Sequence, residues 1–379
     1  MCMGNSFKIL YFVDYLPDVP NSVGNILNVL LNNLLSLGVN QVVAQRPELN
    51  YSVIQKRVVN GFVAYTGDYN SKFDVIKTKI IKKFKDIDNL RVDGEIKYLN
   101  SLIQLEKPDL IFFLIFNPEK HLAEFCKNNG IKNYWMLYDT YVSRPGQRIS
   151  EAIDLEEKVM ELSRGYYVPS FFYDDYCKYY KNENLKSYNL PLLIPKFDVN
   201  DAYSKRDFEN GYEYTYFGQV QAFRNADKIK EICRKINIKI DVFTTDDLES
   251  DDVFIVHKAV SGEKLFQIVA QSKYLVVFDN SKPYDNYLPS KVFLYVSFTK
   301  PVIAFGNNTN SALLRFFEEY PSFFYQNFNE SYSDLNHFIK GNVLSSFNPT
   351  TYDKYSSYLP EKALEQLISS VQETISQNA

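Results

Sequence analysis

The sequence contains few of the residues that build metal centres and disulfide frameworks. Its 379 residues include 4 cysteines, 3 histidines and 1 tryptophan. The cysteines form no CxxC pair and the histidines have no metal-ligand spacing. We therefore predict neither a metal site nor a set of disulfides, and a reducing, cytoplasmic setting fits this cysteine usage best.

Long hydrophobic runs and an excess of basic charge are also absent. The longest apolar run, Leu110 to Phe116, has the length of a strand and falls short of the roughly 20 residues that cross a bilayer. The first residues lack a basic stretch and a small-residue cleavage site, so we do not expect export. A net charge of -4 argues against a general nucleic-acid binder. With 45% hydrophobic and 23% charged residues, the chain is typical of a globular protein and long enough for two domains.

Short apolar runs alternate with helical patterns along the first half of the chain. Residues 8–13 (KILYFV) form an apolar run that leads through a loop into helical spacing at 25–37. Further apolar runs occur at 39–44, 109–115, 133–138 and 165–168. This alternation predicts a mostly parallel sheet with helices on both faces.

A proline-containing stretch divides the chain. Residues 188–203 show no sustained periodicity, and the alternation restarts at 212–217 and continues to a final helix near Pro360. We therefore predict the α/β class with two doubly wound, Rossmann-like domains, whose ligands bind at the carboxyl ends of the strands. The predicted segments are a first domain at 1–190, a linker at 191–203, a second domain at 204–358, and a C-terminal helix at 359–379 that packs back toward the first domain.

Two loops that lead into helices carry residues suited to ligand binding. The loop after the first strand contains Ser22 and Gly24, where helix N-terminal amides would meet an anion or a sugar hydroxyl; the alternative is a plain helix cap. A second loop begins with Gly218 at the end of a strand and leads to Arg224. A planar guanidinium suits a diphosphate, and the alternative is an exposed arginine paired with Asp227.

A third candidate site is the sequence Pro289-Ser290-Lys291 at the head of an apolar helix. The helix N-terminal amides, the Ser290 hydroxyl and the Lys291 ammonium would together hold a phosphate. The alternative is a helix that begins with these residues and binds nothing.

The order of these pieces resembles the nucleotide-binding domain of GT-B glycosyltransferases, particularly those similar to family four. In that family a strand that ends in glycine precedes a phosphate-binding lysine or arginine, and a later segment reads PSK-x-x-E-Y-x-x-x-x-K-P-V-I. Here the matching segment is YLPSKVFLYVSFTKPVIAF. The resemblance covers about residues 212–306 and is most specific at 288–304, whereas KILYFVDYLP and YYVPSFFYDDYCKYY in the first half agree more loosely.

The resemblance implies a GT-B fold whose two domains face each other across a cleft. It implies a nucleotide sugar as the donor, with a UDP-sugar as the first expectation, and no metal or other cofactor. The charged side chains and helix amides would stabilise the departing diphosphate. The implied binding residues are Gly218, Arg224, Pro289, Ser290 and Lys291.

The resemblance also implies that the first domain binds a hydroxyl of a glycan, a glycolipid or a glycoprotein. Asp14 and Asp139 each follow a predicted strand, where either would act as a base or orient the acceptor hydroxyl. Acids at strand ends are also common structural features. Ser22, Gly24 and Asn117 are further acceptor-binding candidates.

Several positions depart from the family pattern. The two usual glutamates fall at Asn286 and Leu294, the second of which serves the nucleotide ribose in that family. Thr299 stands where glycine is common, and Gln219 replaces a frequent arginine. A catalytically silent subunit that stabilises or targets a partner glycosyltransferase is therefore the second hypothesis. A sugar-nucleotide epimerase is the third, although three scattered histidines are few for one.

Residues 72–85 (KFDVIKTKIIKKFK) place apolar residues between lysines at helical spacing. Such a basic amphipathic helix either lies on an anionic membrane, where a lipid-linked acceptor would be found, or packs its apolar face on the sheet. The first reading predicts a cytoplasmic protein at the inner face of a membrane. The sequence does not distinguish a homo-oligomer from a complex with another glycosyltransferase.

Overall fold

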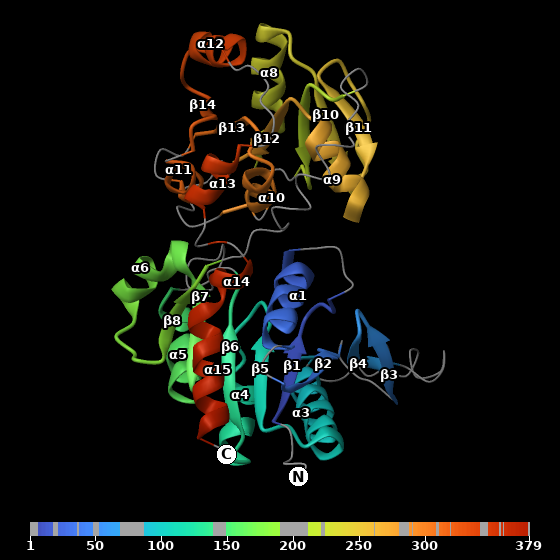
Figure 1. Cartoon of the computed structure of the whole chain (residues 1–379), viewed down its shortest axis with the longest axis vertical. Helices are drawn as coiled ribbons and strands as arrows, with labels where there is room; N and C mark the ends of the chain where they lie inside the picture. Colours follow the sequence, from blue (N-terminus) through green and yellow to red (C-terminus); the bar gives the residue numbers. More distant parts are fainter. Residues whose placement is uncertain are drawn as a thin grey trace. The chain divides into compact units, whose positions relative to one another are not determined.

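The computed structural model describes most of the chain and divides it into two compact units (Figure 1). Unit 1 comprises residues 1–190 and 364–379, and unit 2 comprises residues 191–363. The described residues are 7–17, 22–35, 38–47, 53–68, 87–138, 149–189, 211–220, 224–260, 262–279, 288–289, 291–307, 311–318, 320–341, 348–355, 358 and 360–377.

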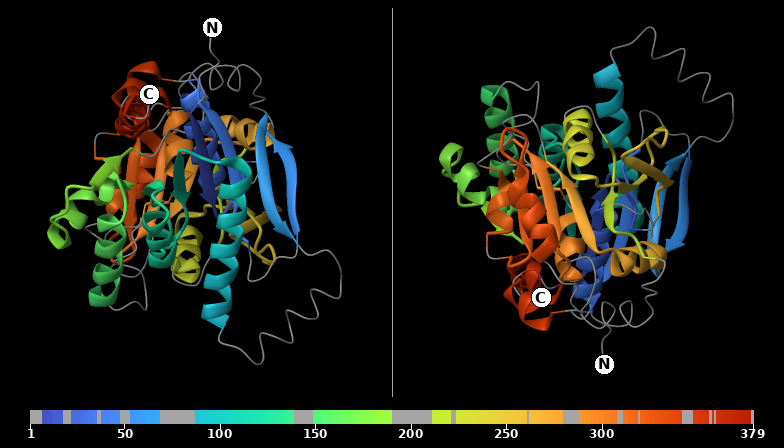
Figure 2. Two further views of the ribbon diagram at one scale, coloured as in Figure 1. Left: turned by 90° about the horizontal axis from the view of Figure 1, so that it is seen from below. Right: turned by 90° about the horizontal axis from the view of Figure 1, so that it is seen from above.

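Unit 1 is built on an eight-stranded sheet with the order β3-β4-β2-β1-β5-β6-β7-β8. All neighbouring strands are parallel except β3 and β4, which form an antiparallel hairpin at one edge (light blue in Figure 2). The strands are β1 (Lys8–Val13), β2 (Asn40–Gln45), β3 (Val53–Val59), β4 (Phe62–Asp68), β5 (Leu110–Leu114), β6 (Lys132–Met136), β7 (Gly165–Pro169) and β8 (Leu185–Tyr188).

The helices of unit 1 connect these strands, and the last helix of the chain joins them. They are α1 (Ser22–Leu35), α3 (Ile87–Glu106), α4 (Lys120–Asn128), α5 (Ile149–Glu161), α6 (Ser170–Tyr179) and α15 (Glu365–Ser376). Tyrosine hydroxyls attach α15 to the sheet: the Tyr167 hydroxyl donates to the Ser370 hydroxyl at 2.6 Å, and the Tyr134 and Thr374 hydroxyls lie 2.9 Å apart. The C-terminal helix therefore completes unit 1.

Unit 2 is built on a six-stranded sheet with the order β11-β10-β9-β12-β13-β14, and all its pairs are parallel. The strands are β9 (Tyr214–Phe217), β10 (Ile240–Thr244), β11 (Phe254–Lys258), β12 (Tyr274–Phe278), β13 (Val302–Gly306) and β14 (Phe323–Asn327). The helices are α8 (Ala226–Ile236), α9 (Gly262–Gln271), α10 (Lys291–Ser297), α11 (Ala312–Phe316), α12 (Ser333–Gly341), α13 (Pro349–Lys354) and α14 (Pro360–Ala363).

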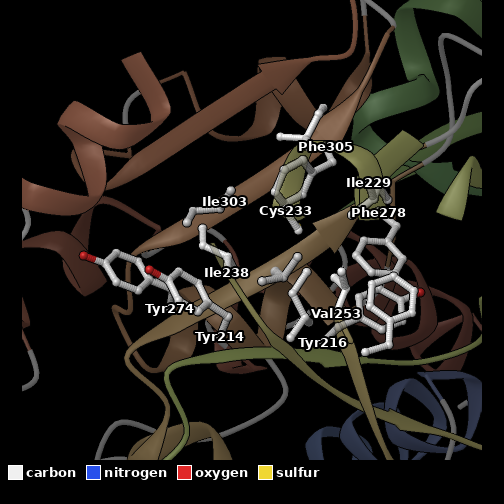
Figure 3. Packing of buried hydrophobic residues seen from close by; sticks show 14 of the residues in the cluster. Tyr214, Tyr216, Ile229, Cys233, Ile238, Val253, Tyr274, Phe278, Ile303 and Phe305 are labelled. Carbon is white, nitrogen blue, oxygen red and sulfur yellow. The ribbon is translucent and has the colours of Figure 1, made fainter. Parts of the chain in front are cut away.

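Aromatic side chains form much of the core of unit 2 (Figure 3). Tyr214 stacks on Tyr274 with ring centroids 5.1 Å apart, and Tyr216 stacks on Phe278 at 3.9 Å. Both pairs join the neighbouring strands β9 and β12. Large flat rings contribute more buried area than aliphatic side chains, so the aromatic residues of this sequence stabilise the centre of the sheet.

The predicted α/β class with two doubly wound sheets is confirmed. The apolar runs at 8–13, 133–138 and 165–168 correspond closely to β1, β6 and β7 because strands buried on both faces need continuous apolar sequence. The sequence pattern did not predict the β3–β4 hairpin. Four consecutive residues of β3, Gln55 to Val58, are exposed, so this edge strand lacks the apolar run that marked the others.

Candidate functional site

In unit 2 the sheet changes direction between β9 and β12. The chain runs from β9 outward to β10 and β11, and then returns to β12 on the other side of β9 before continuing to β13 and β14. Open parallel sheets bind ligands at such a switch point, outside the carboxyl ends of the strands. Gly218 follows β9, Asp279 follows β12 and Lys291 begins α10.

Gly218 combines an unusual backbone with tight packing. Its φ is +123°, a conformation that favours glycine, and its N–H donates to the carbonyl of Phe243 at 2.9 Å. A Cβ at this position would lie 2.7 Å from Nζ of Lys291. The glycine therefore leaves room for the Lys291 ammonium beside the end of β9.

The ammonium of Lys291 lies on an aromatic ring. Its Nζ is 3.8 Å from the centroid of the Tyr216 ring, a cation–π contact, while the residue as a whole remains partly exposed. Burial of the ammonium, helped by the positive charge of Arg224, lowers the pKa of Lys291 well below its usual value. Among the described residues, no carboxylate forms an ion pair with Lys291. The site thus holds a confined lysine amine whose charged form a bound anion would stabilise.

Arg224 is buried, with 5% of its surface exposed, and its Nη1 donates to the carbonyl of Phe278 at 2.7 Å. The alternative of an exposed arginine paired with Asp227 is therefore wrong. Because Arg224 contributes to the pKa of Lys291, the two cations share one electrostatic environment at the β9–β12 switch point. Pro289 is buried just before α10, and Ser290 lies outside the described residues.

A cavity of about 160 Å³ opens beside Gly218 at the carboxyl ends of β9 and β10. Its lining is largely apolar and consists of Phe217, Gly218, Gln219, Phe243, Thr244, Thr245, Ala259, Val260 and Leu265. The lining includes Phe217 and Phe243, whose ring centroids lie 5.2 Å apart in a stacked arrangement. A flat, weakly polar group next to a phosphate would suit this cavity.

The second half of the PSK segment has a structural role. Thr299 has a φ of +50°, which explains why glycine is common at this place, and its hydroxyl accepts a hydrogen bond from the N–H of Asn348 at 2.9 Å. Lys300 is 1% exposed, and its ammonium donates to the carbonyl of Ala270 at 2.6 Å. Leu294, where the resemblance would place a ribose-binding glutamate, is 3% exposed and packs in the core.

Unit 1 has its own switch point, between β1 and β5, where Asp14 follows β1. Oδ2 of Asp14 accepts a hydrogen bond from the N–H of Phe116 at 2.6 Å, and 15% of its side chain is exposed. Asn117 is exposed on the loop after β5, so these two residues lie on neighbouring loops at the same sheet edge. Gly24 is buried in the first turn of α1.

Two acceptor candidates cannot be placed in this way. Asp139 lies outside the described residues, as does the whole basic segment 72–85. Ser22 is the first residue of α1, but its side chain lies outside the described part. These assignments stay predictions.

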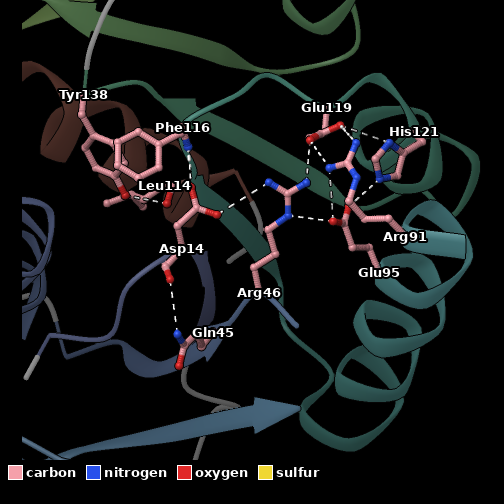
Figure 4. Close-up of polar contacts among 10 residues, drawn as sticks. All are labelled: Asp14, Gln45, Arg46, Arg91, Glu95, Leu114, Phe116, Glu119, His121 and Tyr138. Carbon is pink, nitrogen blue, oxygen red and sulfur yellow. Dashed lines mark hydrogen bonds and ion pairs between the residues drawn. The ribbon is translucent and has the colours of Figure 1, made fainter. Parts of the chain in front are cut away.

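A buried ionic cluster lies next to Asp14 and was not predicted from the sequence (Figure 4). Arg46, just after β2, contacts Glu95 at 2.7 Å and Glu119 at 2.5 Å. Glu119 also contacts Arg91 at 2.6 Å, and Nε2 of His121 lies 2.7 Å from Glu95. The five residues of this cluster lie just after β2, on α3 and at the start of α4. Because they are far apart in the sequence, no local motif identifies them. The one signal in the sequence was a charged residue, Arg46, two positions after the predicted strand at 39–44.

None of the helices in the described ranges has the length and apolar character needed to span a bilayer, and no group of histidine, cysteine, aspartate and glutamate in these ranges is arranged to hold a metal ion.

The fold is similar to that of several solved sugar-processing enzymes, although no protein-family model and no curated protein matches the sequence. Sucrose-phosphate synthase from Thermosynechococcus elongatus has a TM-score of 0.65 at 9% identity and covers 98% of this chain and 98% of its own. A glycosyltransferase from Rickettsia africae has a TM-score of 0.65 at 10% identity, covering 98% and 99%. UDP-GlcNAc 2-epimerase from Methanocaldococcus jannaschii has a TM-score of 0.56 at 9% identity, covering 97% and 100%. The chain therefore has the GT-B fold.

Proposed function

We propose that this protein is a metal-independent glycosyltransferase that moves a sugar from a nucleoside diphosphate sugar to a hydroxyl group of an acceptor. The observation that carries the proposal is the confined ammonium of Lys291, which lies beside Gly218 at the switch point of unit 2. A fold of this kind serves several chemistries, so the function has to be argued from these residues.

The proposed diphosphate site consists of Lys291, Arg224 and the backbone at Gly218. The positive charges of Lys291 and Arg224 repel each other. A ligand with two negative charges would offset this repulsion and so stabilise both charged side chains. During transfer, negative charge grows on the departing diphosphate, and preorganised cations at that place lower the barrier. The site needs no metal ion for this task.

The proposed nucleobase site is the cavity lined by Phe217 and Phe243. It adjoins Gly218, so a nucleotide whose phosphates contact Lys291 would direct its base toward these rings. A UDP-sugar is the first donor to test. With Leu294 packed in the core, ribose recognition falls to other residues than a glutamate at that position.

The proposed acceptor site is the carboxyl edge of unit 1, where Asp14 and Asn117 follow β1 and β5. A carboxylate next to a polar amide suits a sugar hydroxyl. Asp139 is a second candidate for the base. A glycan, glycolipid or glycoprotein acceptor, in cell-surface polysaccharide or glycoprotein assembly, fits the proposal; residues 72–85 would supply a peripheral contact with the inner face of a membrane.

Calorimetric titration with UDP, GDP and dTDP tests the donor site. We expect one of these nucleotides to bind the wild type and to bind Lys291→Met at least about tenfold more weakly. Lys264→Met is the control and should bind as the wild type does, because Lys264 is exposed on α9. Equal affinity for Lys291→Met would contradict the site. No binding to the wild type would favour the silent subunit instead, for which the buried Leu294 is the supporting observation.

The reaction itself is distinguished by its products. With a bound nucleotide sugar and a panel of hydroxyl acceptors, transfer releases the nucleoside diphosphate and creates a glycosidic linkage, both visible by NMR. Conversion of the nucleotide sugar into its epimer without release of nucleotide would show an epimerase and overturn the transferase proposal.

A further inference from the structure

The carboxylate of Asp14 is held on one side and open on the other. Oδ2 accepts the N–H of Phe116 at 2.6 Å, and Oδ1 lies 3.6 Å from Nη1 of Arg46. The exposed part of the side chain is 15%, so a ligand at the sheet edge can reach it. Burial raises the pKa of Asp14, while the Phe116 N–H and the charge of Arg46 oppose this rise.

Arg46 is the centre of this arrangement because each of its three nitrogens faces a different carboxylate. Nε contacts Glu95 at 2.7 Å, Nη2 contacts Glu119 at 2.5 Å, and Nη1 faces Asp14. The planar fork of a guanidinium, with donors fixed on three nitrogens, suits simultaneous contacts with several carboxylates. Glu95 and Glu119 are 1% and 10% exposed, so the two short contacts fix the guanidinium and leave one edge for Asp14.

A second layer of contacts fixes the two glutamates in turn. Arg91 contacts Glu119 at 2.6 Å, and Nε2 of His121 lies 2.7 Å from Glu95 (Figure 4). Burial works to raise the pKa of Glu95, but His121 and Arg46 hold it below its usual value. Among the described residues, the charged and titratable groups that interact electrostatically with Asp14 are Arg46, Glu119 and Tyr138.

We propose that Arg46 is a positioning residue of the acceptor site, which keeps the Asp14 carboxylate ionised and oriented so that it accepts the proton of the acceptor hydroxyl. This inference rests on the proposed transferase function. In the step, the O–H proton passes to Asp14, the acceptor oxygen forms a bond to the anomeric carbon, and the bond from that carbon to the diphosphate breaks. The nucleoside diphosphate leaves with the electron pair. Arg46 touches neither substrate and acts through Asp14.

The test compares Arg46→Met/Glu95→Gln with Glu95→Gln alone, so that the buried cation is removed together with one buried anion and the cluster keeps its net charge. Arg46→Lys retains the charge without the fork, and Arg57→Met on the exposed part of β3 is the matched control. The Asp14 carboxyl is titrated by carbon NMR in the intact protein and assigned with Asp14→Asn. Transfer is measured across pH in parallel.

Relative to Glu95→Gln alone, we expect the titration midpoint of the Asp14 carboxyl in Arg46→Met/Glu95→Gln to rise by about one pH unit. This is the lower end of the shift that loss of a nearby opposite charge produces. The acid limb of the rate profile should move by the same amount, with the rate recovering at higher pH. Arg57→Met should leave both unchanged. An unmoved Asp14 midpoint in a folded double variant overturns the role of Arg46. A wild type that transfers no sugar overturns the proposed function instead, and the titration still decides whether Arg46 controls Asp14.

Discussion

Gly218→Ala tests the geometry of the donor site with a single methyl group. At φ +123° a non-glycine residue is strained by about 1–3 kcal/mol. For a unit of this size, 1 kcal/mol corresponds to about 2–4 °C, so the melting temperature of unit 2 should fall by about 2–12 °C. The new Cβ would also lie 2.7 Å from Nζ of Lys291, and the flexible lysine would move its ammonium off the Tyr216 ring. Losing one charged contact to a phosphate weakens nucleotide binding by about ten- to a hundredfold.

Calorimetry of unfolding and of nucleotide binding separates the two effects. In a Lys291→Ala background the crowding disappears while the backbone strain stays, so Gly218→Ala should still lower the melting temperature but should change nucleotide affinity little further. Gly341→Ala, which adds a methyl group in open space at the end of α12, is the control and should leave both quantities near wild type. Wild-type nucleotide affinity in Gly218→Ala would refute the assignment of this glycine and its lysine to the phosphates.

Three further changes probe other parts of the structure. Lys291→Met should weaken nucleotide binding at least about tenfold and yet raise stability near neutral pH, because burial and Arg224 disfavour the charged amine in the folded state. The gain in stability should shrink as pH rises toward the lysine's ordinary pKa, as chemical denaturation across pH would show. Glu156→Leu removes the carboxylate that accepts hydrogen bonds from the hydroxyls of Tyr166, Tyr176 and Tyr180. The free energy of unfolding in urea should fall by about 3 kcal/mol or more, and a fall below about 1 kcal/mol would mean that these hydrogen bonds contribute little to stability. Gly165→Ala would place a Cβ 2.8 Å from the buried ring of Tyr134 and should destabilise unit 1 by about 1–3 kcal/mol; unchanged urea unfolding would show that the ring can shift.

The sheet cores and several charged site residues could be predicted from the sequence, whereas the partners of those charged residues could not. Continuous apolar runs identify the buried parallel strands, since few other structures need them. Gly218 could be singled out because a glycine directly after a strand is a local signal. The contact between Lys291 and Tyr216, by contrast, joins residues about 75 positions apart, and only the strand order β9-β12 brings them together.

The acidic partners of Arg46 illustrate the same limit. Glu95 is on α3 and Glu119 precedes α4, so their approach depends on how two helices pack and not on any spacing in the sequence. On a helix, a buried glutamate and a solvated one look alike in sequence. Their requirements differ in the folded protein, because a buried carboxylate needs charged or hydrogen-bonding partners and a solvated one does not.

Each of the two sheets has a switch point in its strand order, and the ionic side chains described there carry opposite charges. In unit 1 a carboxylate, Asp14, faces outward and its cation lies behind it; in unit 2 the ammonium of Lys291 lies at the edge, on an aromatic ring. A switch point does not by itself require this difference in charge. An anionic edge suits a neutral hydroxyl that must lose a proton, and a cationic edge suits a diphosphate that gains charge.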